Sequence, residues 1–155
     1  MDNWKVAVVK GLAPGALASL ASAAMLALGA KRENGRVFAG TNAVSHWLWG
    51  DKAFQQDGPS WKYTLVGYGI HHASATLWGS LFEQAAGKLL ARKSPAATLA
   101  ASAAASAVAC FVDYQLTPRR LRPGFEERLS RRSLALVYAA FALGLAGGAW
   151  YNRRR

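Results

Sequence analysis

The sequence has little cysteine and little negative charge. Cys110 is the only cysteine among 155 residues, so no intrachain disulfide can form and thiolates cannot build a zinc finger. Eight Asp and Glu residues stand against nineteen Lys and Arg residues, for a formal net charge of +11. Such an excess suggests nucleic acid as a partner of a water-soluble protein, but no recognisable nucleic-acid-binding motif accompanies it. We therefore expect no nucleic-acid partner.

Sequence patterns of common enzymes are missing as well. The chain has no HExxH zinc motif, no Walker-type phosphate loop, no GxGxxG dinucleotide turn and no GxSxG nucleophile elbow. Its serines have no evident base and orienting residue nearby in the sequence, which leaves only a triad assembled by the fold. We therefore favour a non-enzymatic protein and assign it no catalytic residue and no cofactor.

Apolar residues are abundant and gather into long uncharged stretches. Hydrophobic residues make up 52% of the chain, and the 17% of charged residues cluster between the stretches. A helix of about 20 residues is as long as the hydrocarbon core of a bilayer is thick. Spans are expected at about residues 11–30, 63–86, 94–116 and 133–150. The sequence therefore predicts a single all-α membrane domain, residues 1–155, built as a four-helix transmembrane bundle.

The first stretch also fits a secretory signal peptide. Lys5 and Lys10 precede the apolar run, and Ala27-Leu-Gly resembles a small-residue cleavage site. The run is long for a signal peptide, however, and three further spans would hold the protein in the membrane in either case. A first transmembrane span is the interpretation we favour.

Residues between the first two spans are too polar to cross a membrane, yet they contain aromatic and aliphatic side chains. These are Val44, Trp47, Leu48, Trp49 and Phe54. Trp favours the headgroup level because its ring is apolar while its N–H group is polar. We expect a short amphipathic segment at the membrane interface here.

Basic residues flank the apolar stretches, where they would meet anionic lipid headgroups. The residues expected to do so are Arg119, Arg120, Arg122, Arg131 and Arg132. The two sides of a four-span protein would carry similar numbers of Lys and Arg, so charge does not orient the chain.

Small residues provide the expected packing faces. Gly11 and Gly15 form a GxxxG pattern in the first span, and the fourth span contains Gly144, Gly147 and Gly148. The third span has alanines at four-residue spacing, at 97, 101, 105 and 109. Small side chains allow helix backbones to approach closely in a membrane.

Two adjacent histidines, His71 and His72, lie well inside the second span. Neighbouring residues of a helix point about 100° apart, so at most one is expected to be a ligand or proton carrier. His72 shares the more polar face with Tyr68, and imidazole can bind haem iron, copper or zinc or relay protons. The alternative is a histidine that bonds a hydroxyl or carbonyl of a neighbouring helix and serves packing alone.

Asp113, near the end of the third span, and His46, in the interfacial segment, are further candidates. A polar path could lead from Asp113 through Tyr68 to a histidine, and His46 could complete it or supply a second metal ligand. As alternatives, His46 is exposed and Asp113 forms a salt bridge with one of the arginines at 119–122. Ion pairing is also expected for Glu83, with Lys88 nearby.

Short motifs resemble known membrane proteins. Gly11-Leu-Ala-Pro-Gly in the first span and Gly69-Ile-His-His in the second are similar to the YagU-like bacterial inner-membrane proteins. The stretch Leu121-Arg-Pro-Gly-Phe-Glu and the following span resemble a group of short proteobacterial membrane proteins of uncharacterised activity. The resemblance implies a multi-pass protein of the bacterial inner (cytoplasmic) membrane and implies no mechanism.

The function we expect is that of a non-enzymatic accessory or binding protein. The polar face of its second span would receive a small ligand, a lipid or a partner helix, and its partners would be the anionic bilayer and a homo-oligomer or membrane protein. One alternative is a small transporter or proton-coupled channel that uses His72, Tyr68 and Asp113. Another is a metal or haem redox protein with a histidine ligand in the second span.

Overall fold

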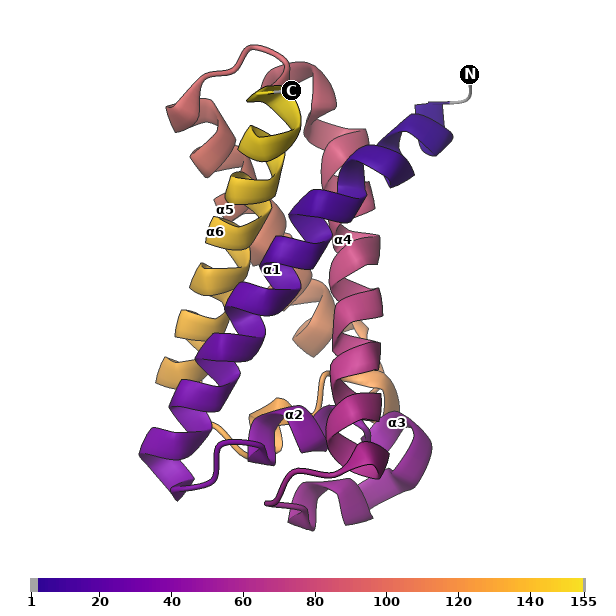
Figure 1. Cartoon of the computed structure of the whole chain (residues 1–155), viewed down its shortest axis with the longest axis vertical. Coiled ribbons are helices and arrows are strands. Elements are labelled where there is room, and N and C mark those ends of the chain that lie inside the picture. Colours follow the sequence, from indigo (N-terminus) through magenta and orange to yellow (C-terminus); the bar gives the residue numbers. More distant parts are fainter. Residues whose placement is uncertain (1–2, 155) are drawn as a thin grey trace. The chain divides into compact units, whose positions relative to one another are not determined.

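The computed structural model describes residues 3–154, and no β-strand occurs among them. The long helices are α1 (Asn3–Asn34), α4 (Val66–Leu90), α5 (Pro95–Phe111) and α6 (Arg131–Arg154) (Figure 1). Short helices α2 (Ala39–Val44) and α3 (His46–Trp49) follow α1. The prediction of an all-α fold is confirmed for the described residues.

Single helical turns connect these elements. Three of the connecting turns have the tight 3₁₀ geometry: η1 (Gly50–Gln55), η4 (Arg119–Leu121) and η5 (Phe125–Glu127). Two have the wide π geometry: η2 (Trp61–Leu65), which leads into α4, and η3 (Val112–Leu116), which continues α5. The π turns lengthen two long helices at one end each.

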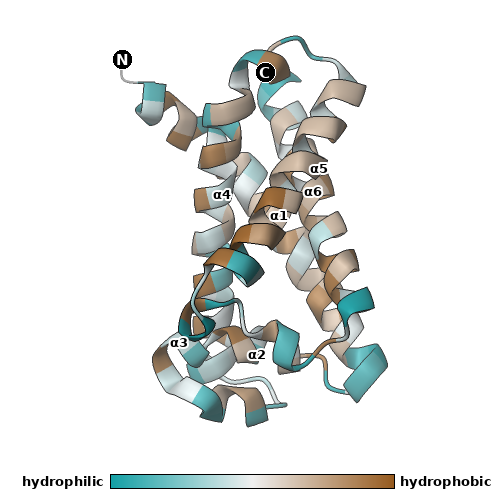
Figure 2. Ribbon diagram, turned by 180° about the vertical axis from the view of Figure 1, so that it is seen from behind, coloured by the Kyte–Doolittle hydropathy of each residue, from teal (hydrophilic) through white to brown (hydrophobic). Residues whose placement is uncertain are grey.

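Three helical segments are long and apolar enough to cross a membrane. They are α1, α5 together with η3, and α6, with mean hydropathies of 1.6, 1.7 and 1.6 over their most apolar stretches. The helix α4 is not among them, and Figure 2 shows it paler than the brown, hydrophobic helices. Hydropathy thus selects three of the four expected spans.

The residues divide into two compact units. Unit 1 contains α1 up to Ser22, α4 from His72, α5 up to Cys110 and α6 from Tyr138. Unit 2 contains residues 23–71 and 111–137, which include the short helices and connecting turns. Each unit has its own packing and is described separately.

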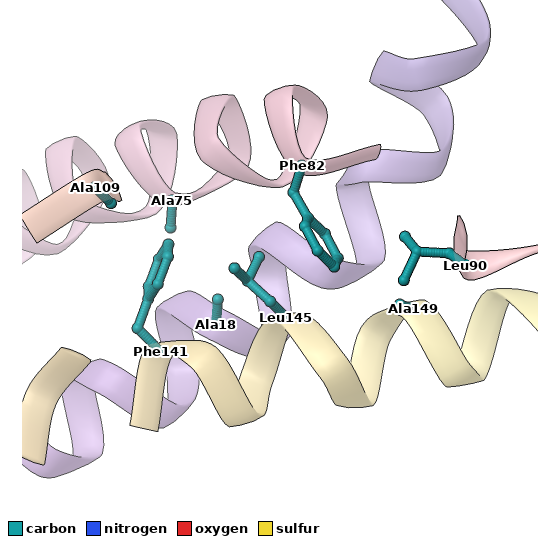
Figure 3. Close-up of a cluster of buried hydrophobic side chains, with 8 residues drawn as sticks. All are labelled: Ala18, Ala75, Phe82, Leu90, Ala109, Phe141, Leu145 and Ala149. Atoms are coloured by element: carbon teal, nitrogen blue, oxygen red, sulfur yellow. The ribbon is translucent and has the colours of Figure 1, made fainter. Parts of the chain in front are cut away.

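The core of unit 1 is made of alanine, leucine and phenylalanine side chains from all four of its helical segments (Figure 3). It comprises Ala18, Ala75, Phe82, Leu90, Ala109, Phe141, Leu145 and Ala149. Ala101 and Ala105 pack against this core and Ala109 belongs to it, so these members of the predicted alanine face do face inward. Alternation of Phe with Ala lets the aromatic rings fill the space that the small residues leave.

Glycines bring the backbone of α1 against α4 and α6. A Cβ atom on Gly11 or Gly15 would lie 2.5 Å from the Cα atom of Ser80 or Thr76 of α4. On α6, a Cβ atom on Gly144 or Gly148 would overlap the backbone of Ala18 or Pro14. The predicted packing role of these glycines is confirmed, whereas Gly147 has only one ordinary contact, with Leu17.

Proline in the middle of α1 is accommodated by a hydrogen bond from α6. Pro14 has no N–H group, so the carbonyl of Lys10, four residues earlier, loses its helical donor. The side-chain amide Nδ2 of Asn152 donates to this carbonyl over 2.6 Å. One helix therefore satisfies the backbone group that a proline frees in another.

The inward face of α5 is lined with hydroxyls. Thr98, Ser102 and Ser106 are buried. Ser102 donates to the carbonyl of Thr98 over 2.8 Å, while Ser106 donates to the carbonyl of Tyr138 on α6 over 2.7 Å. The hydroxyls of Ser102 and Ser106 are thus satisfied within α5 or by α6, which permits their burial.

Candidate functional site

The polar face of α4 packs against α1 in unit 1. Nδ1 of His72 lies 3.1 Å from Oγ of Ser19, and Oγ1 of Thr76 donates to the backbone carbonyl of His72 over 2.9 Å. One turn further, Gly79 meets the backbone of Gly11 and Gly15. Of the two adjacent histidines, His72 therefore faces the helix partner.

A serine and a histidine at this distance resemble half of a nucleophilic triad, so their access matters. Ser19 is completely buried, and an electrophilic substrate could not approach its hydroxyl without displacing a helix. The contact has the geometry of an interhelical hydrogen bond of about 1 kcal/mol. It matches the packing role that the sequence left open for His72.

The other two histidines belong to unit 2 and lie in aromatic surroundings. The ring of His71 meets the edge of Phe125 with centroids 6.3 Å apart. The ring of His46 stacks at a tilt on Phe54, 5.0 Å away, and its Nδ1 lies 2.9 Å from the carbonyl of Ala43. The expectation of an exposed His46 is wrong, because this side chain is buried.

His46 is buried because the 117–130 segment packs onto α3. The guanidinium of Arg120 donates to the carbonyls of His46 and Trp47, over 2.8 Å each. In return, Nε1 of Trp47 donates to the carbonyl of Arg122 over 2.9 Å. Gly124 has a φ of +91°, and a Cβ atom there would lie 2.5 Å from Nδ1 of His46, so only glycine fits this contact.

An acidic side chain lies in the same region of unit 2. The carboxylate of Glu126 accepts a hydrogen bond of 2.7 Å from the backbone N–H of Gly124. Burial raises the pKa of this carboxyl above its ordinary value, and the charge of Glu127 adds to the effect, while backbone hydrogen bonds and His46 oppose it. Glu126 is therefore a group of the connecting segment whose charge the fold disfavours.

Two of the five arginines expected at lipid headgroups donate hydrogen bonds to backbone carbonyls of the protein. Arg120 binds the two carbonyls of α3, and Nε of Arg122 donates to the carbonyl of Thr117 over 3.3 Å. Arg119, Arg131 and Arg132 are exposed. Asp113, their predicted neighbour, lies in η3.

The ion pair expected for Glu83 has a different partner. Both carboxylate oxygens of Glu83 on α4 bind the guanidinium of Arg153 on α6, over 2.9 and 2.8 Å, rather than Lys88. The side chains are 1% and 12% exposed. The sequence held a signal for this pair, because the four spans that it predicts would place residues 83 and 153 toward the same side of the membrane.

A network that the sequence did not reveal organises the start of α4. Oδ1 of Asn42, which is fully buried, accepts from Oγ1 of Thr64 over 2.6 Å. Its Nδ2 group donates to the carbonyls of Gln56 and Gly58 over 3.0 and 2.9 Å. Asn42 thereby joins α2, the loop before η2 and η2 itself.

The same turn is capped by Ser60. Its Oγ accepts from the backbone N–H of Tyr63 over 3.0 Å, and its own N–H donates to Oγ1 of Thr64 over 2.9 Å. This reciprocal pairing satisfies donors that a helix start leaves without partners. The partner residue lies four positions after the cap rather than three, which fits the wider π turn.

A depression of about 440 Å³ lies beside this capped turn. Its lining residues are Pro59, Ser60, Trp61, Thr64, Leu65 and Tyr68. Tyr68, one of the residues predicted to form a ligand or proton path, is thus among the lining residues. The remaining predicted residues, His46, His71 and Asp113 in unit 2 and His72 in unit 1, do not line it.

Within the described part of the chain, no three His, Cys, Asp or Glu side chains are placed to hold a metal ion together. The chain matches no protein-family model, no curated protein and no solved structure.

Proposed function

We propose that the chain is a multi-pass membrane protein, with α4 as a fourth span, and that it serves as a non-enzymatic binding or accessory protein of the bacterial inner membrane. The start of α4 is its ligand-receiving element. The observation that carries the proposal is the distribution of side chains: many large apolar residues of the long helices are exposed, whereas most of their serines and Thr98 are buried.

Exposed apolar residues are numerous on the three hydropathic helices. On α1 they include Val8, Val9, Leu12, Leu17, Leu20 and Leu28, and further along the chain they include Leu99, Val108, Phe111, Leu136 and Leu143. Buried serines and Thr98 lie on the opposite faces. A water-soluble protein rarely leaves such continuous apolar surface uncovered, whereas lipid tails would cover it.

The outward face of α4 supports its assignment as a span. Leu65, Gly69, Ala73 and Leu77 follow at four-residue spacing and are all exposed, so about four turns present only apolar side chains outward. His72, Thr76 and Ser80 point toward α1. These inward polar groups lower the mean hydropathy of α4, although lipid would not contact them.

The segment between α1 and α4 fits the level of the lipid headgroups. Nε1 of Trp49 donates to the carbonyl of Lys62 over 2.8 Å, while the ammonium of Lys62 lies 4.8 Å from the centre of the Trp49 ring. Rings with polar edges beside cations are typical of membrane interfaces. This segment would therefore lie along the membrane surface.

Membrane extraction tests the first part of the proposal. With one tag at each terminus, the protein should stay in the membrane pellet after alkaline carbonate washing and keep both tags. Release into the supernatant would contradict membrane integration. Loss of the N-terminal tag alone would instead identify the first stretch as a cleaved signal peptide.

Native mass spectrometry tests the binding role. Protein extracted in mild detergent should retain lipid or a stoichiometric membrane partner, because the depression at α4 leaves apolar surface open. A protein that carries neither, and that takes up no lipid when membrane lipid is added back, would contradict a binding function.

A further inference from the structure

The depression beside η2 leaves two large apolar side chains uncovered. Trp61 is 83% exposed and Leu65 is 55% exposed, and both line the cavity. Its volume of about 440 Å³ falls within the range of about 300–1,000 Å³ that is usual for ligand sites. The cavity is thus large enough for part of a ligand and offers hydrophobic contact.

The hydroxyls of Ser60 and Thr64 in the lining already make hydrogen bonds within the protein. Oγ of Ser60 accepts from Tyr63 N–H, and Oγ1 of Thr64 accepts from Ser60 N–H while it donates to Asn42. No Asp, Glu, Lys or Arg is among the lining residues. A sugar or nucleotide would find few polar partners here, because the hydroxyls of Ser60 and Thr64 serve the cap, whereas a hydrocarbon chain needs no such partner.

A lysine is the sequence neighbour of one of the lining residues. Lys62 follows Trp61, and its ammonium lies 4.8 Å from the ring centre of Trp49 and 5.4 Å from that of Tyr63. The two rings hold the positive charge by cation–π attraction. An anionic group would meet a localised charge close to an apolar cavity.

We infer that this depression binds an anionic phospholipid, with one acyl chain against Trp61 and Leu65 and the phosphate near Lys62. The inference rests on the proposed function, since η2 must lie where α4 enters the membrane. At that level, acyl chains begin on one side and phosphates lie on the other. The chain's net charge of +11 also favours an anionic lipid.

The test is photo-crosslinking with phosphatidylglycerol that carries a diazirine in its acyl chain. The full chain is placed in nanodiscs of phosphatidylcholine that contain a trace of this probe, and crosslinked residues are mapped by mass spectrometry. Crosslinks should concentrate in residues 59–68. Even distribution over the outward faces of the four long helices would overturn the inference.

Matched variants sharpen the test. Leu65→Trp fills the depression, whereas Leu77→Trp makes the same change at a leucine of α4 that is 60% exposed and lies outside the cavity. Crosslinking at 59–68 should fall about tenfold in Leu65→Trp, equivalent to about 1.4 kcal/mol, and stay unchanged in Leu77→Trp. Equal crosslinking in the two variants would overturn the inference.

Two further comparisons separate the possible causes of failure. Lys62→Gln should lower the preference for the phosphatidylglycerol probe over a phosphatidylcholine probe, and an unchanged preference would overturn the role of the anionic headgroup. Carbonate extraction is run on the same membranes. Embedded protein with evenly spread crosslinks contradicts the lipid site alone, whereas protein released from the membrane contradicts the proposed function as well.

Discussion

Breaking the ion pair between Glu83 and Arg153 should destabilise unit 1 strongly. The carboxylate of Glu83 is 1% exposed and makes both of its contacts with the guanidinium, which is 12% exposed. Glu83→Ala leaves that guanidinium buried, with the carbonyl of Ala149 as its remaining partner at 3.2 Å. Removal of one partner from a buried pair costs about 3–5 kcal/mol, and we expect a loss of this size.

The double variant distinguishes a coupled pair from two separate effects. Glu83→Met combined with Arg153→Met removes both charges and keeps much of the side-chain volume. Replacement of a buried ion pair by apolar residues is often neutral or stabilising. The double variant should therefore be far more stable than either Glu83→Met or Arg153→Met alone. The free energy of unfolding is measured by titration of detergent-solubilised protein with SDS.

Two results would refute this reasoning. A loss below about 1 kcal/mol for Glu83→Ala would class the pair with exposed surface pairs. Additive losses in the double variant would mean that the two side chains act independently, contrary to their shared hydrogen bonds.

Three further predictions follow from close contacts and burial. Gly15→Leu should lower the free energy of unfolding by more than the roughly 1–3 kcal/mol typical of an overpacked core, because the new Cβ atom would meet the α4 backbone. A Cβ atom on Gly69 would meet nothing within 4 Å, so Gly69→Leu should leave the free energy of unfolding unchanged in the same SDS titration. Asn152→Ala should lower the free energy of unfolding by about 1 kcal/mol in the natural chain. In a Pro14→Ala background it should have no effect, because the alanine at position 14 supplies the helical N–H group to the carbonyl of Lys10. Equal losses of stability in both backgrounds would contradict this prediction. Because burial raises the pKa of Glu126 above 4.5, its ionisation should lower stability as pH rises from the ordinary pKa through the raised one. Glu126→Gln should remove this decline in thermal stability above pH 4.5; parallel profiles for the two proteins would refute the effect.

The long helices could be predicted because their signals are local. The apolar stretches at 11–30, 94–116 and 133–150 lie within α1, within α5 with η3 apart from residue 94, and within α6. The GxxxG pattern of Gly11 and Gly15 predicted a close backbone approach, because small residues have few other uses at that spacing. The second stretch, 63–86, begins inside η2 and ends before α4 does.

The surroundings of polar residues depended on tertiary contacts that the sequence does not encode locally. His46 is buried only because the 117–130 segment, more than 70 positions later, closes over it. Asn42 looks unremarkable in the sequence, yet it makes hydrogen bonds with three residues 14 to 22 positions away. Glu83 has a nearby lysine in the sequence, but helix packing supplies Arg153 instead.

Mean hydropathy does not detect the proposed fourth span, α4, for a physical reason. A mean over consecutive residues mixes the inward polar face with the outward apolar one, although only the outward face would meet lipid. The outward apolar face is still recognisable in the structure, because exposed residues recur at four-residue spacing at Leu65, Gly69, Ala73 and Leu77.

The most direct test of the account is therefore whether α4 crosses the membrane. Topology reporters are fused after Lys93, between α4 and α5, and at the C-terminus, and each is compared with a reporter at the N-terminus. Four spans predict that all three reporters lie on the same side of the membrane. If the reporter after Lys93 and the C-terminal reporter both lie on the side opposite the N-terminus, then only α1, α5 and α6 cross, and the proposed role of α4 is wrong.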